Sequence, residues 1–321
     1  MDSSNFKIMH KVITITLSPA VDKNTSVDQL VPEKKLSCLP PDYDPGGGGI
    51  NVSKGLKKLG TNSLCLFPAG GASGTHLIEL MEETGVTCMP TTIHNSTREN
   101  FIVVETSTNQ QFRFGMPATE LHADEVDALL TTFTRHAMGS DYIVASGAIP
   151  AGAGTDFFAR IASVAKKANA RLVVDTSGEA LREVLEVGVF LVKPNLGELS
   201  KLYGTDTLDS RMVDEAAGEL IGNGKCKAVV VSMGPQGAML ITAEEKIQVS
   251  APLVKKMSTV GAGDSMVAGM VHALTLGKSM REVIQMGVAC GTAATMNPGT
   301  ELFKKEDAER LYHTMMRPNK L

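Results

Sequence analysis

Tryptophan is absent from this sequence of 321 residues, and aromatic residues make up only 4% of it. Such a composition favours an α/β protein with small residues at its close contacts over a protein with an aromatic-rich binding surface. An excess of positive charge is also lacking, since 31 lysines and arginines face 35 aspartates and glutamates. A protein that follows a phosphate backbone has the opposite balance, so no nucleic-acid partner is expected.

Features of a disulfide-rich, zinc-binding or membrane protein are missing as well. The five cysteines are scattered and never form a CxxC pair, and the seven histidines show no HExxH spacing. The uncharged run at 283–300 contains three glycines and a proline, so it cannot cross a bilayer as one apolar helix. The leader MDSSNFKIMHK lacks the apolar centre of a signal peptide. We therefore expect a cytoplasmic protein without membrane contact.

Two common nucleotide-binding motifs are absent. A dinucleotide-binding loop should follow the first strand, but LSPAVDK there contains no glycine. The segment 277–279 ends like a Walker A loop, but His272 stands where that loop needs its first glycine. A nicotinamide-dependent oxidoreductase and a P-loop enzyme are both disfavoured.

Segments typical of strands and helices alternate over the C-terminal two thirds of the chain. From Glu120 onward, runs such as DYIVASG and KAVVVSMG are separated by amphipathic segments such as FFARIASVAKKAN. Repeated strand–helix–strand units predict an α/β fold whose mainly parallel sheet has helices on both faces. Residues 11–17 predict a further buried strand. The stretches 22–45 and 91–116 are polar and β-rich, which predicts a smaller sheet with one wet face beside this core.

The strongest local signal is STVGAGDS at 258–265, which leads directly into a predicted helix. Gly261 and Gly263 let backbone amides face a ligand without a side chain in the way. The N-terminus of the helix also favours negative charge at this place. Asp264 beside it could accept the proton of an attacking hydroxyl, as a kinase requires. The alternative is that Asp264 only caps the helix.

A second glycine-rich signal lies at 44–60, DPGGGGINVSKGLKKLG. Four successive glycines before an amphipathic helix allow a ligand to touch the backbone, and Asn51 is a polar group at that mouth. The alternative is a flexible turn before an ordinary helix.

The remaining candidates are polar side chains that suit a metal ion or a phosphate. Asn195 and Glu198, in VKPNLGEL, are three residues apart, hence on one helical face. They could hold hydrated Mg²⁺ through its water shell, or they could form a capping box. Arg98 and Arg113 lie in the polar insert, and a guanidinium group suits a phosphate dianion. An arginine on a strand is, however, more often only solvated.

Together and in this order, these segments resemble the ribokinase-like sugar kinase family, and in particular its phosphofructokinase B branch. The similarity runs from about Val12 to Tyr312 and rests on TLSPAVD, PGGGGINV, FPAGGASGTHL, TREN, RFGMP, VDTSGEAL, LVKPNLGEL, VVVSMGPQGA and STVGAGDSM. The resemblance implies a three-layer α/β sandwich with a mainly parallel central sheet and a small β-sheet lid. The core would comprise 12–22, 46–90 and 117–321. The lid would comprise 23–45 and 91–116 and would also form the contact of a homodimer.

The resemblance also implies roles for the residues that match the family's motifs. Asp264 would be the general base, and the backbone amides of Gly261, Ala262 and Gly263 would bind the transferred phosphoryl group. The residues that would hold the sugar phosphate are Asp22, Gly46, Gly47, Asn51, Arg98 and Arg113. Those that would serve ATP are Lys35, Lys193, Asn195, Glu198, Ser232, Gly234 and Gly237, with Mg²⁺ at Asn195 and Glu198. A K⁺ ion would be held by Ser258, Val260, Ala294, Asn297 and Gly299.

The reaction that the resemblance implies is ATP-dependent phosphorylation of the C1 hydroxyl of fructose 6-phosphate to fructose 1,6-bisphosphate, a step of glycolysis. Related branches that act on fructose 1-phosphate or tagatose 6-phosphate usually carry a lysine where this chain has Gly48. That difference favours fructose 6-phosphate, with the other two substrates as alternatives. A sugar-phosphate-binding protein without catalysis is a third reading, which the presence of Asp264, Asn195 and Glu198 disfavours.

Overall fold

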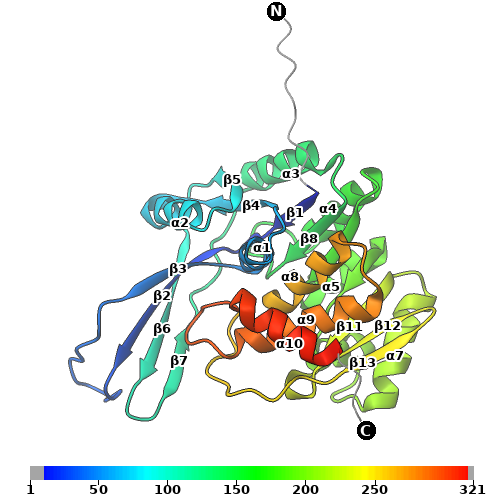
Figure 1. Cartoon of the computed structure of the whole chain (residues 1–321). Coiled ribbons are helices and arrows are strands. Elements are labelled where there is room, and N and C mark those ends of the chain that lie inside the picture. The colour runs from blue at the N-terminus through cyan, green and yellow to red at the C-terminus, as the bar shows by residue number, and fades with distance from the viewer. Residues whose placement is uncertain (1–10, 317–321) are drawn as a thin grey trace, which may run out of the picture.

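The computed structural model describes residues 11–316, which form two β-sheets and the helices around them (Figure 1). The larger sheet has nine strands in the spatial order β13-β12-β11-β10-β9-β8-β1-β4-β5. These strands are β1 (Val12–Ile15), β4 (Leu64–Ala69), β5 (Thr87–Thr92), β8 (Tyr142–Ser146), β9 (Arg171–Asp175), β10 (Val189–Val192), β11 (Cys226–Ser232), β12 (Ala238–Thr242) and β13 (Lys246–Val249). From β11 to β5 all neighbours are parallel, and only β12 and β13 are added antiparallel at one edge. The predicted α/β fold with a mainly parallel sheet is confirmed.

The central strands consist mainly of apolar residues because both faces of this sheet are covered. The sequences VITI of β1 and VFLV of β10 consist largely of β-branched residues, which pack well on a pleated surface. All four residues of β1 are buried, as expected for a strand with helices on both sides. The strand predicted over 11–17 is therefore present as the shorter, fully buried β1, between β8 and β4.

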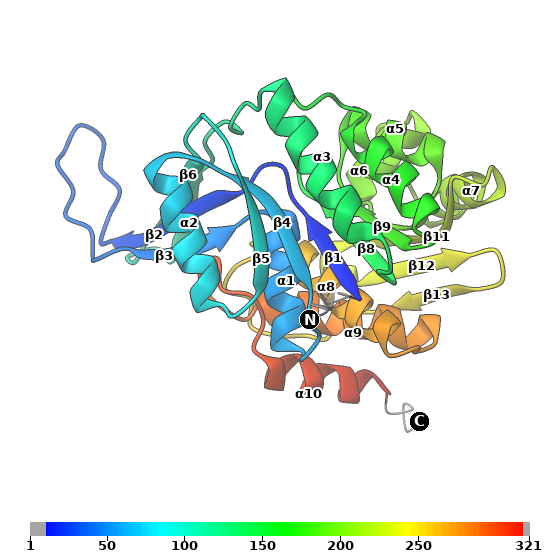
Figure 2. The ribbon, with the colours of Figure 1, turned by 90° about the horizontal axis from the view of Figure 1, so that it is seen from above.

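Helices form a layer on each face of the larger sheet (Figure 2). One face carries α3 (Ala123–Ala137), α4 (Phe157–Lys167), α5 (Gly178–Val187), α6 (Leu196–Tyr203) and α7 (Ser210–Gly222). The other carries α1 (Gly48–Lys58), α8 (Ala262–Thr275) and α9 (Met280–Ala294), with α10 (Lys305–Met316) packed on α9. Helix α2 (Gly71–Glu83) packs where the two sheets meet. The three layers expected from the resemblance are present.

The smaller sheet has the strand order β3-β2-β6-β7 and projects from one side of the core (Figure 1). Its strands are β2 (Ala20–Val27), β3 (Asp42–Gly46), β6 (Arg98–Glu105) and β7 (Gln110–Phe114). The bounds predicted for the lid differ from those of the smaller sheet at three places. Strand β2 already begins at Ala20, β3 still includes Gly46, and Thr91 and Thr92 pair with β4 in the larger sheet. These differences arise because a strand continues past the point at which the composition of the chain changes.

The chain ends, residues 1–10 and 317–321, lie outside the described residues, and so does all but Lys11 of the leader for which no signal peptide is expected. Within residues 11–316, no helix has both the length and the hydropathy that a membrane span requires.

Candidate active site

Helices α1 and α8 begin side by side, and each begins at a glycine with positive φ. Gly47 (φ 123°) precedes α1 and Gly261 (φ 69°) precedes α8, and this backbone conformation favours residues without a Cβ atom. Asn51 in the first turn of α1 donates a hydrogen bond from Nδ2 to Oδ2 of Asp264 in the first turn of α8, at 2.9 Å. The two glycine-rich signals, 213 residues apart in the sequence, are thus parts of one site.

Asp264 has the ionisation behaviour of a group that can take up a proton near neutrality. Its removal from water and the nearby charge of Asp175 raise its pKa to about 6. The hydrogen bond from Asn51 and the positive charges of Lys193 and Lys54 oppose this rise. A general base works best when its pKa lies close to the working pH. The pKa of Asp264 therefore suits proton transfer from a hydroxyl group.

A buried ion pair lies next to the first turn of α8. Lys193 Nζ is 3.0 Å from Asp175 Oδ1, and the side chains are only 6% and 16% exposed. A Cβ atom built on Gly263 would be 3.8 Å from Lys193 Nζ, so this cation lies beside the backbone amides of the loop. Burial alone would lower the pKa of Lys193, but Asp175 outweighs it and the pKa is raised. Lys193 is therefore a permanent positive charge at the place where an anion would bind.

Asp175 was not among the residues predicted from the sequence. It is the last residue of β9 (RLVVD), and ligands of open α/β sheets bind at the carboxyl ends of parallel strands. A charged residue that ends a buried strand is therefore a signal that could have identified it.

Asn195 and Glu198 form the capping box that was the alternative to a metal site. Asn195 Oδ1 accepts from Glu198 N at 2.9 Å, and Glu198 Oε2 accepts from Asn195 N at 2.8 Å. Glu198 keeps its second carboxylate oxygen outside this pair, which fits contact with the water shell of an ion. Among residues 11–316 no group of three acidic, histidine or cysteine side chains could hold a metal by itself. The donor set thus fits Mg²⁺ only as an ion that also binds phosphates and keeps several waters.

The residues predicted for the nucleotide lie at neighbouring strand ends, with one exception. Ser232 N donates to Pro194 O at 3.0 Å, which places the end of β11 beside Asn195. Gly234 and Gly237 bound the short turn that follows β11. Lys35, by contrast, is an exposed residue of the loop 28–41 at the far end of the smaller sheet (Figures 1 and 2). Within one chain, the structure does not bring Lys35 to the site.

The predicted sugar-binding residues gather where the smaller sheet meets α1. Asp22 Oδ1 accepts from Asn100 Nδ2 at 2.8 Å, and burial raises the pKa of Asp22. A Cβ atom on Gly46 would lie 2.3 Å from Asp22 Oδ2, so any other residue there would displace the Asp22 carboxylate. The Asp22 carboxylate and the start of α1 therefore share one small volume, and Asn100 was missed by the sequence analysis.

The two predicted phosphate-binding arginines differ in their surroundings. Arg98 donates to the backbone carbonyls of Ser18, Pro19 and Met116 at 3.0–3.3 Å, which occupies three of its five N–H groups. Arg113 is exposed, and its Nη2 donates to Thr259 Oγ1 at 3.2 Å, in the loop that leads to α8. Arg98 thus fixes the base of the smaller sheet, and Arg113 reaches the anion-binding loop.

The residues predicted for K⁺ come from two segments of the chain, the loop before α8 and the end of α9 with the segment that follows it. Ser258 Oγ donates to Gly299 O at 2.8 Å and accepts from Val260 N at 3.2 Å. Asn297 N donates to Ala294 O at 3.2 Å. The oxygen atoms of Ser258, Gly299 and Ala294 are of the type that binds K⁺, and here each takes part in a hydrogen bond within the protein.

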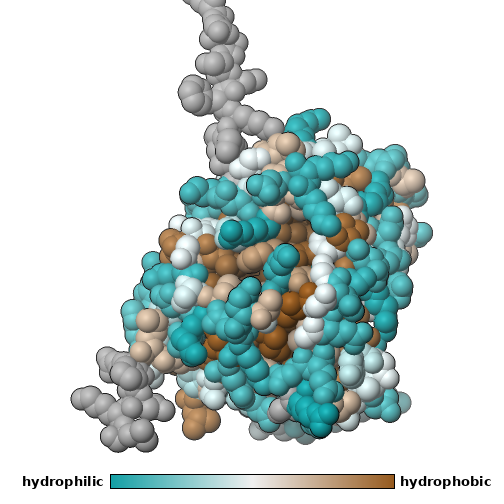
Figure 3. All heavy atoms as spheres, turned by 90° about the vertical axis from the view of Figure 1, so that its right-hand side faces the viewer, coloured by the Kyte–Doolittle hydropathy of each residue, from teal (hydrophilic) through white to brown (hydrophobic). Residues whose placement is uncertain are grey.

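A hollow of about 840 Å³ lies at the opposite end of the larger sheet, at the amino ends of β8, β9 and β10. Figure 3 faces this side and shows apolar residues in the middle of the face between polar ones. Two cations of its lining serve the protein itself: Lys166 donates to Val187 O, and Arg171 donates to Tyr142 Oη at 2.8 Å. The catalytic candidates lie at the other end of the strands, so this hollow is separate from the site.

Comparison with known proteins identifies the family. Residues 10–307 match the model of the pfkB family carbohydrate kinases. The chain belongs to this family. It is 41% identical to the ATP-dependent 6-phosphofructokinase isozyme 2 of Escherichia coli, over 96% of this chain and 100% of that protein. A 1-phosphofructokinase of Rhodobacter capsulatus is 31% identical, over 95% and 96% of the two chains. The resemblance to the phosphofructokinase B branch is confirmed, and the protein is a sugar-phosphate kinase.

Solved structures agree with this assignment. The crystal structure of phosphofructokinase-2 from Escherichia coli in complex with potassium matches with a TM-score of 0.92 and 41% identity, over 96% of this chain and 100% of that one. The same relative has been solved with fructose-6-phosphate and in a tetrameric inhibited form. The ribokinase of Arabidopsis thaliana, 20% identical with a TM-score of 0.73 over 95% and 99% of the chains, shows the same fold. The kinase thus has the ribokinase-like fold.

Proposed function

We propose that this kinase transfers the terminal phosphoryl group of ATP to the C1 hydroxyl of fructose 6-phosphate. The observation that carries the proposal is the contact of Asn51 with Asp264 at the N-terminus of α8. This contact brings together a carboxylate of suitable pKa, the backbone amides at the start of α8 that can bind an anion, and the glycine-rich segment that would bind the sugar. The name and the fructose-6-phosphate complex of the Escherichia coli relative support this choice of substrate.

In this proposal Asp264 is the general base. Its pKa near 6 leaves it ionised at neutral pH and still basic enough to take the proton of the C1 hydroxyl as the oxygen attacks. Asn51 holds this carboxylate in place, because its Nδ2 donates to Asp264 Oδ2. A positioned base contributes about 10²–10⁴-fold to the rate.

The phosphoryl group would be stabilised by charge and by the backbone, since this reaction depends on positioning and electrostatics. The amides of Gly261, Ala262 and Gly263 lie at the positive end of α8. The ion-paired Lys193 lies beside them. Mg²⁺ supplies further neutralisation when it is bound with ATP, and Asn195 and Glu198 are the residues that would hold its water shell.

The sugar would lie between the smaller sheet and α1. Asp22 with Gly46 and Gly47 would bind its hydroxyl groups, and Arg113 would meet the 6-phosphate, with two N–H groups of Arg98 left to assist. A side chain at Gly48 would place its Cβ atom 2.3 Å from Ser146 Oγ and 2.8 Å from Ser146 C. This site therefore has no room for the lysine of the other branches, which favours fructose 6-phosphate.

The experiment that tests the proposal measures ADP release at fixed Mg·ATP with fructose 6-phosphate, fructose 1-phosphate and tagatose 6-phosphate in parallel. A kcat/KM at least tenfold higher for fructose 6-phosphate is the expected result, since tenfold corresponds to about 1.4 kcal/mol of transition-state binding. A preference for another sugar phosphate would reassign the substrate. Binding without ADP release would replace the kinase by a sugar-phosphate-binding protein.

Three finer points belong to this proposal. We infer a homodimer through the smaller sheet, whose exposed Phe114 and Met116 offer apolar contact area; the tetrameric form of the relative is a larger assembly. Binding of K⁺ at the loop of Ser258 and Gly299 is supported by the potassium complex of that relative. A cytoplasmic location stays a prediction.

A further inference from the structure

Lys54 is a charged residue at the candidate site that neither the glycine motifs nor the proposed mechanism uses. It lies in α1, three residues after Asn51 and therefore on the same face of the helix. Its Nζ donates to the carbonyl oxygen of Pro45 at 2.9 Å. Pro45 precedes Gly46, so Lys54 ties the end of β3, which leads into the glycine run, to the helix that carries Asn51.

Three carboxylates from three elements act on the charge of the ammonium group. Asp22 on β2 and Asp44 on β3 are register partners in the smaller sheet, and Asp264 lies in the first turn of α8. Burial lowers the pKa of Lys54, and each of these carboxylates acts against that change. Lys58, one turn further along α1, is the remaining charge that acts on it.

The other charges at this junction already have close partners. Lys193 is paired with Asp175 at 3.0 Å, and Arg98, which acts on Asp22, is bound to backbone carbonyls. Within residues 11–316, Lys54 forms no ion pair shorter than 4.0 Å and bonds instead to the neutral Pro45 carbonyl. Its charge thus acts on Asp44, Asp22 and Asp264 without a direct ion pair to any of these three carboxylates.

We propose that Lys54 is a positioning residue that couples the sugar side of the site to the base. Its hydrogen bond fixes Pro45 and Gly46 against α1, and its charge holds Asp22 and Asp264 at one junction. A kinase in which this link is broken keeps both carboxylates but loses their common arrangement. The inference rests on the proposed function, because it takes Asp264 as the base and Gly46 as part of the sugar site.

The test compares Lys54→Met with Lys54→Arg, which keeps the charge, and with Lys58→Met, which removes a neighbouring charge from the exposed end of the same helix. Thermal unfolding first establishes that each variant is folded, and Lys54→Gln replaces Lys54→Met if the latter is not. The ¹³C NMR titration of the Asp264 carboxyl group is then followed without substrates, with Asp264→Asn to assign the resonance. This readout does not depend on turnover.

We expect the pKa of Asp264 to rise, by about one pH unit or less, in Lys54→Met, because the positive charge of Lys54 favours the ionised carboxylate. It should stay at the wild-type value in Lys54→Arg and Lys58→Met. In the kinase assay Lys54→Met should raise the KM for the sugar phosphate roughly tenfold and leave the KM for ATP unchanged. In the plot of kcat against pH for Lys54→Met, the fall on the acidic side should shift to higher pH, together with the pKa of Asp264.

An unchanged Asp264 titration in folded Lys54→Met would overturn the proposal and leave Lys54 a residue of packing only. An equal rise in Lys58→Met would overturn it as well, since the effect would then belong to the charge of the whole helix. If the wild-type protein phosphorylates none of the three sugar phosphates, the proposed function fails, and the NMR titration still decides whether Lys54 controls Asp264.

Discussion

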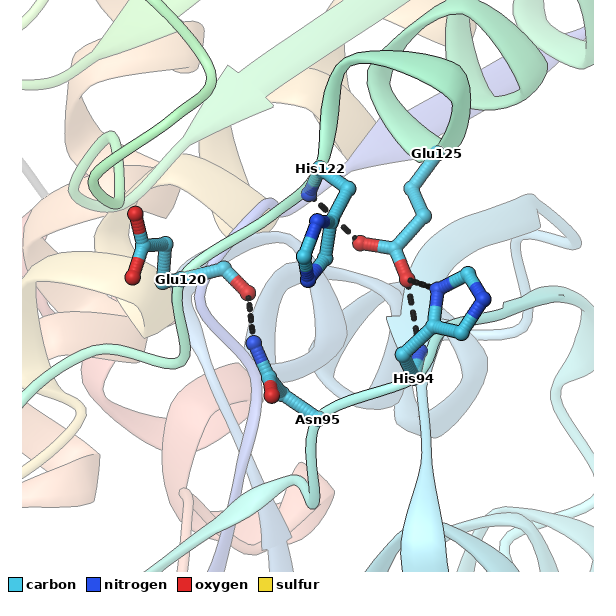
Figure 4. Close-up of polar contacts among 5 residues, drawn as sticks. All are labelled: His94, Asn95, Glu120, His122 and Glu125. Carbon is cyan, nitrogen blue, oxygen red and sulfur yellow. Dashed lines mark hydrogen bonds and ion pairs between the residues drawn. The ribbon is translucent and has the colours of Figure 1, made fainter.

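Asp264 and Glu125 are two shielded carboxylates with opposite ionisation behaviour. Asp264 has one hydrogen-bond donor, Asn51, and its pKa is raised to about 6. Glu125 is 3% exposed and accepts from His94 N, His94 Nδ1 and His122 N at 2.6–2.7 Å (Figure 4). Burial alone would raise the pKa of Glu125, but these bonds outweigh it and the pKa is lowered. At Asp264 burial and the charge of Asp175 outweigh the single donor, whereas at Glu125 the three donors outweigh burial.

The difference corresponds to different tasks. Glu125 joins two segments of the chain, one entering the smaller sheet after β5 and one returning from β7 to α3 (Figure 4). Asn95 and the carbonyl of Glu120 add a bond of 3.0 Å between the same segments. A carboxylate satisfied in this way is a structural anchor, whereas one that is poorly satisfied is free to take up a proton.

The largest effect is expected from Asp264→Asn, which keeps the shape of the side chain and removes the base. Turnover should fall by about 10³-fold, while binding of the sugar phosphate and ATP stays within a few-fold, because only proton transfer is lost. Steady-state kinetics and calorimetric binding measure the two quantities. A variant that retained more than a tenth of the wild-type kcat would remove Asp264 from the role of base.

The sequence predicts some parts of this site and not others, for a physical reason. The predicted residues belong to local motifs: Gly261, Asp264 and Asn51. In such motifs, residues that are neighbours in the sequence specify both the turn and the start of the helix. The strands of β-branched residues and the apolar face of α8 are equally local, so the layers of the fold follow from the sequence. Asp175 and Lys54 matter only through their neighbours in space. Those neighbours depend on the strand order and on how the smaller sheet joins the core.

The dependence on neighbours in space also explains why two residues have contacts other than those predicted from the sequence. Arg98 resembles a phosphate ligand in the motif TREN, but three backbone carbonyls near the base of the smaller sheet use most of its donors. Lys35 matches a family position, but the loop 28–41 holds it away from the site of its own chain. A motif specifies which residue is present, and the packing around it determines what that residue contacts.

Glu125→Gln should give the reverse of the Asp264 result. One amide oxygen cannot accept all three hydrogen bonds, so the free energy of unfolding should fall by about 1–3 kcal/mol. The value of kcat measured well below the melting temperature should be unchanged. Urea unfolding and steady-state kinetics test this, with Glu120→Gln as the matched control, because only the backbone of Glu120 takes part in these contacts. A loss of kcat without a loss of stability would mean that Glu125 acts on the reaction.

The smallest effects concern pH, and they have opposite signs for the two carboxylates. The raised pKa of Asp264 means that the folded protein binds this proton more tightly than the unfolded chain, whose value is 3.8. Its contribution to stability is therefore complete below pH 3.8 and is lost as the pH rises through about 6. The lowered pKa of Glu125 acts the other way: its contribution is present above 4.5, the value in the unfolded chain, and is lost on acidification.

Unfolding curves between pH 4 and pH 8, roughly the window of these two pKa values, separate the two contributions. Relative to wild type, Asp264→Asn should gain stability as the pH rises through about 6, since the variant no longer places a charge where it is poorly solvated. The free energy of unfolding of Glu125→Gln should be furthest below that of the wild type at the upper end of the pH range, and the difference should shrink on acidification. The wild-type kcat should fall on the acidic side of about 6, in step with protonation of Asp264. If the stability of both variants changed in the same direction with pH, the pKa values of the two carboxylates would not be shifted in opposite directions.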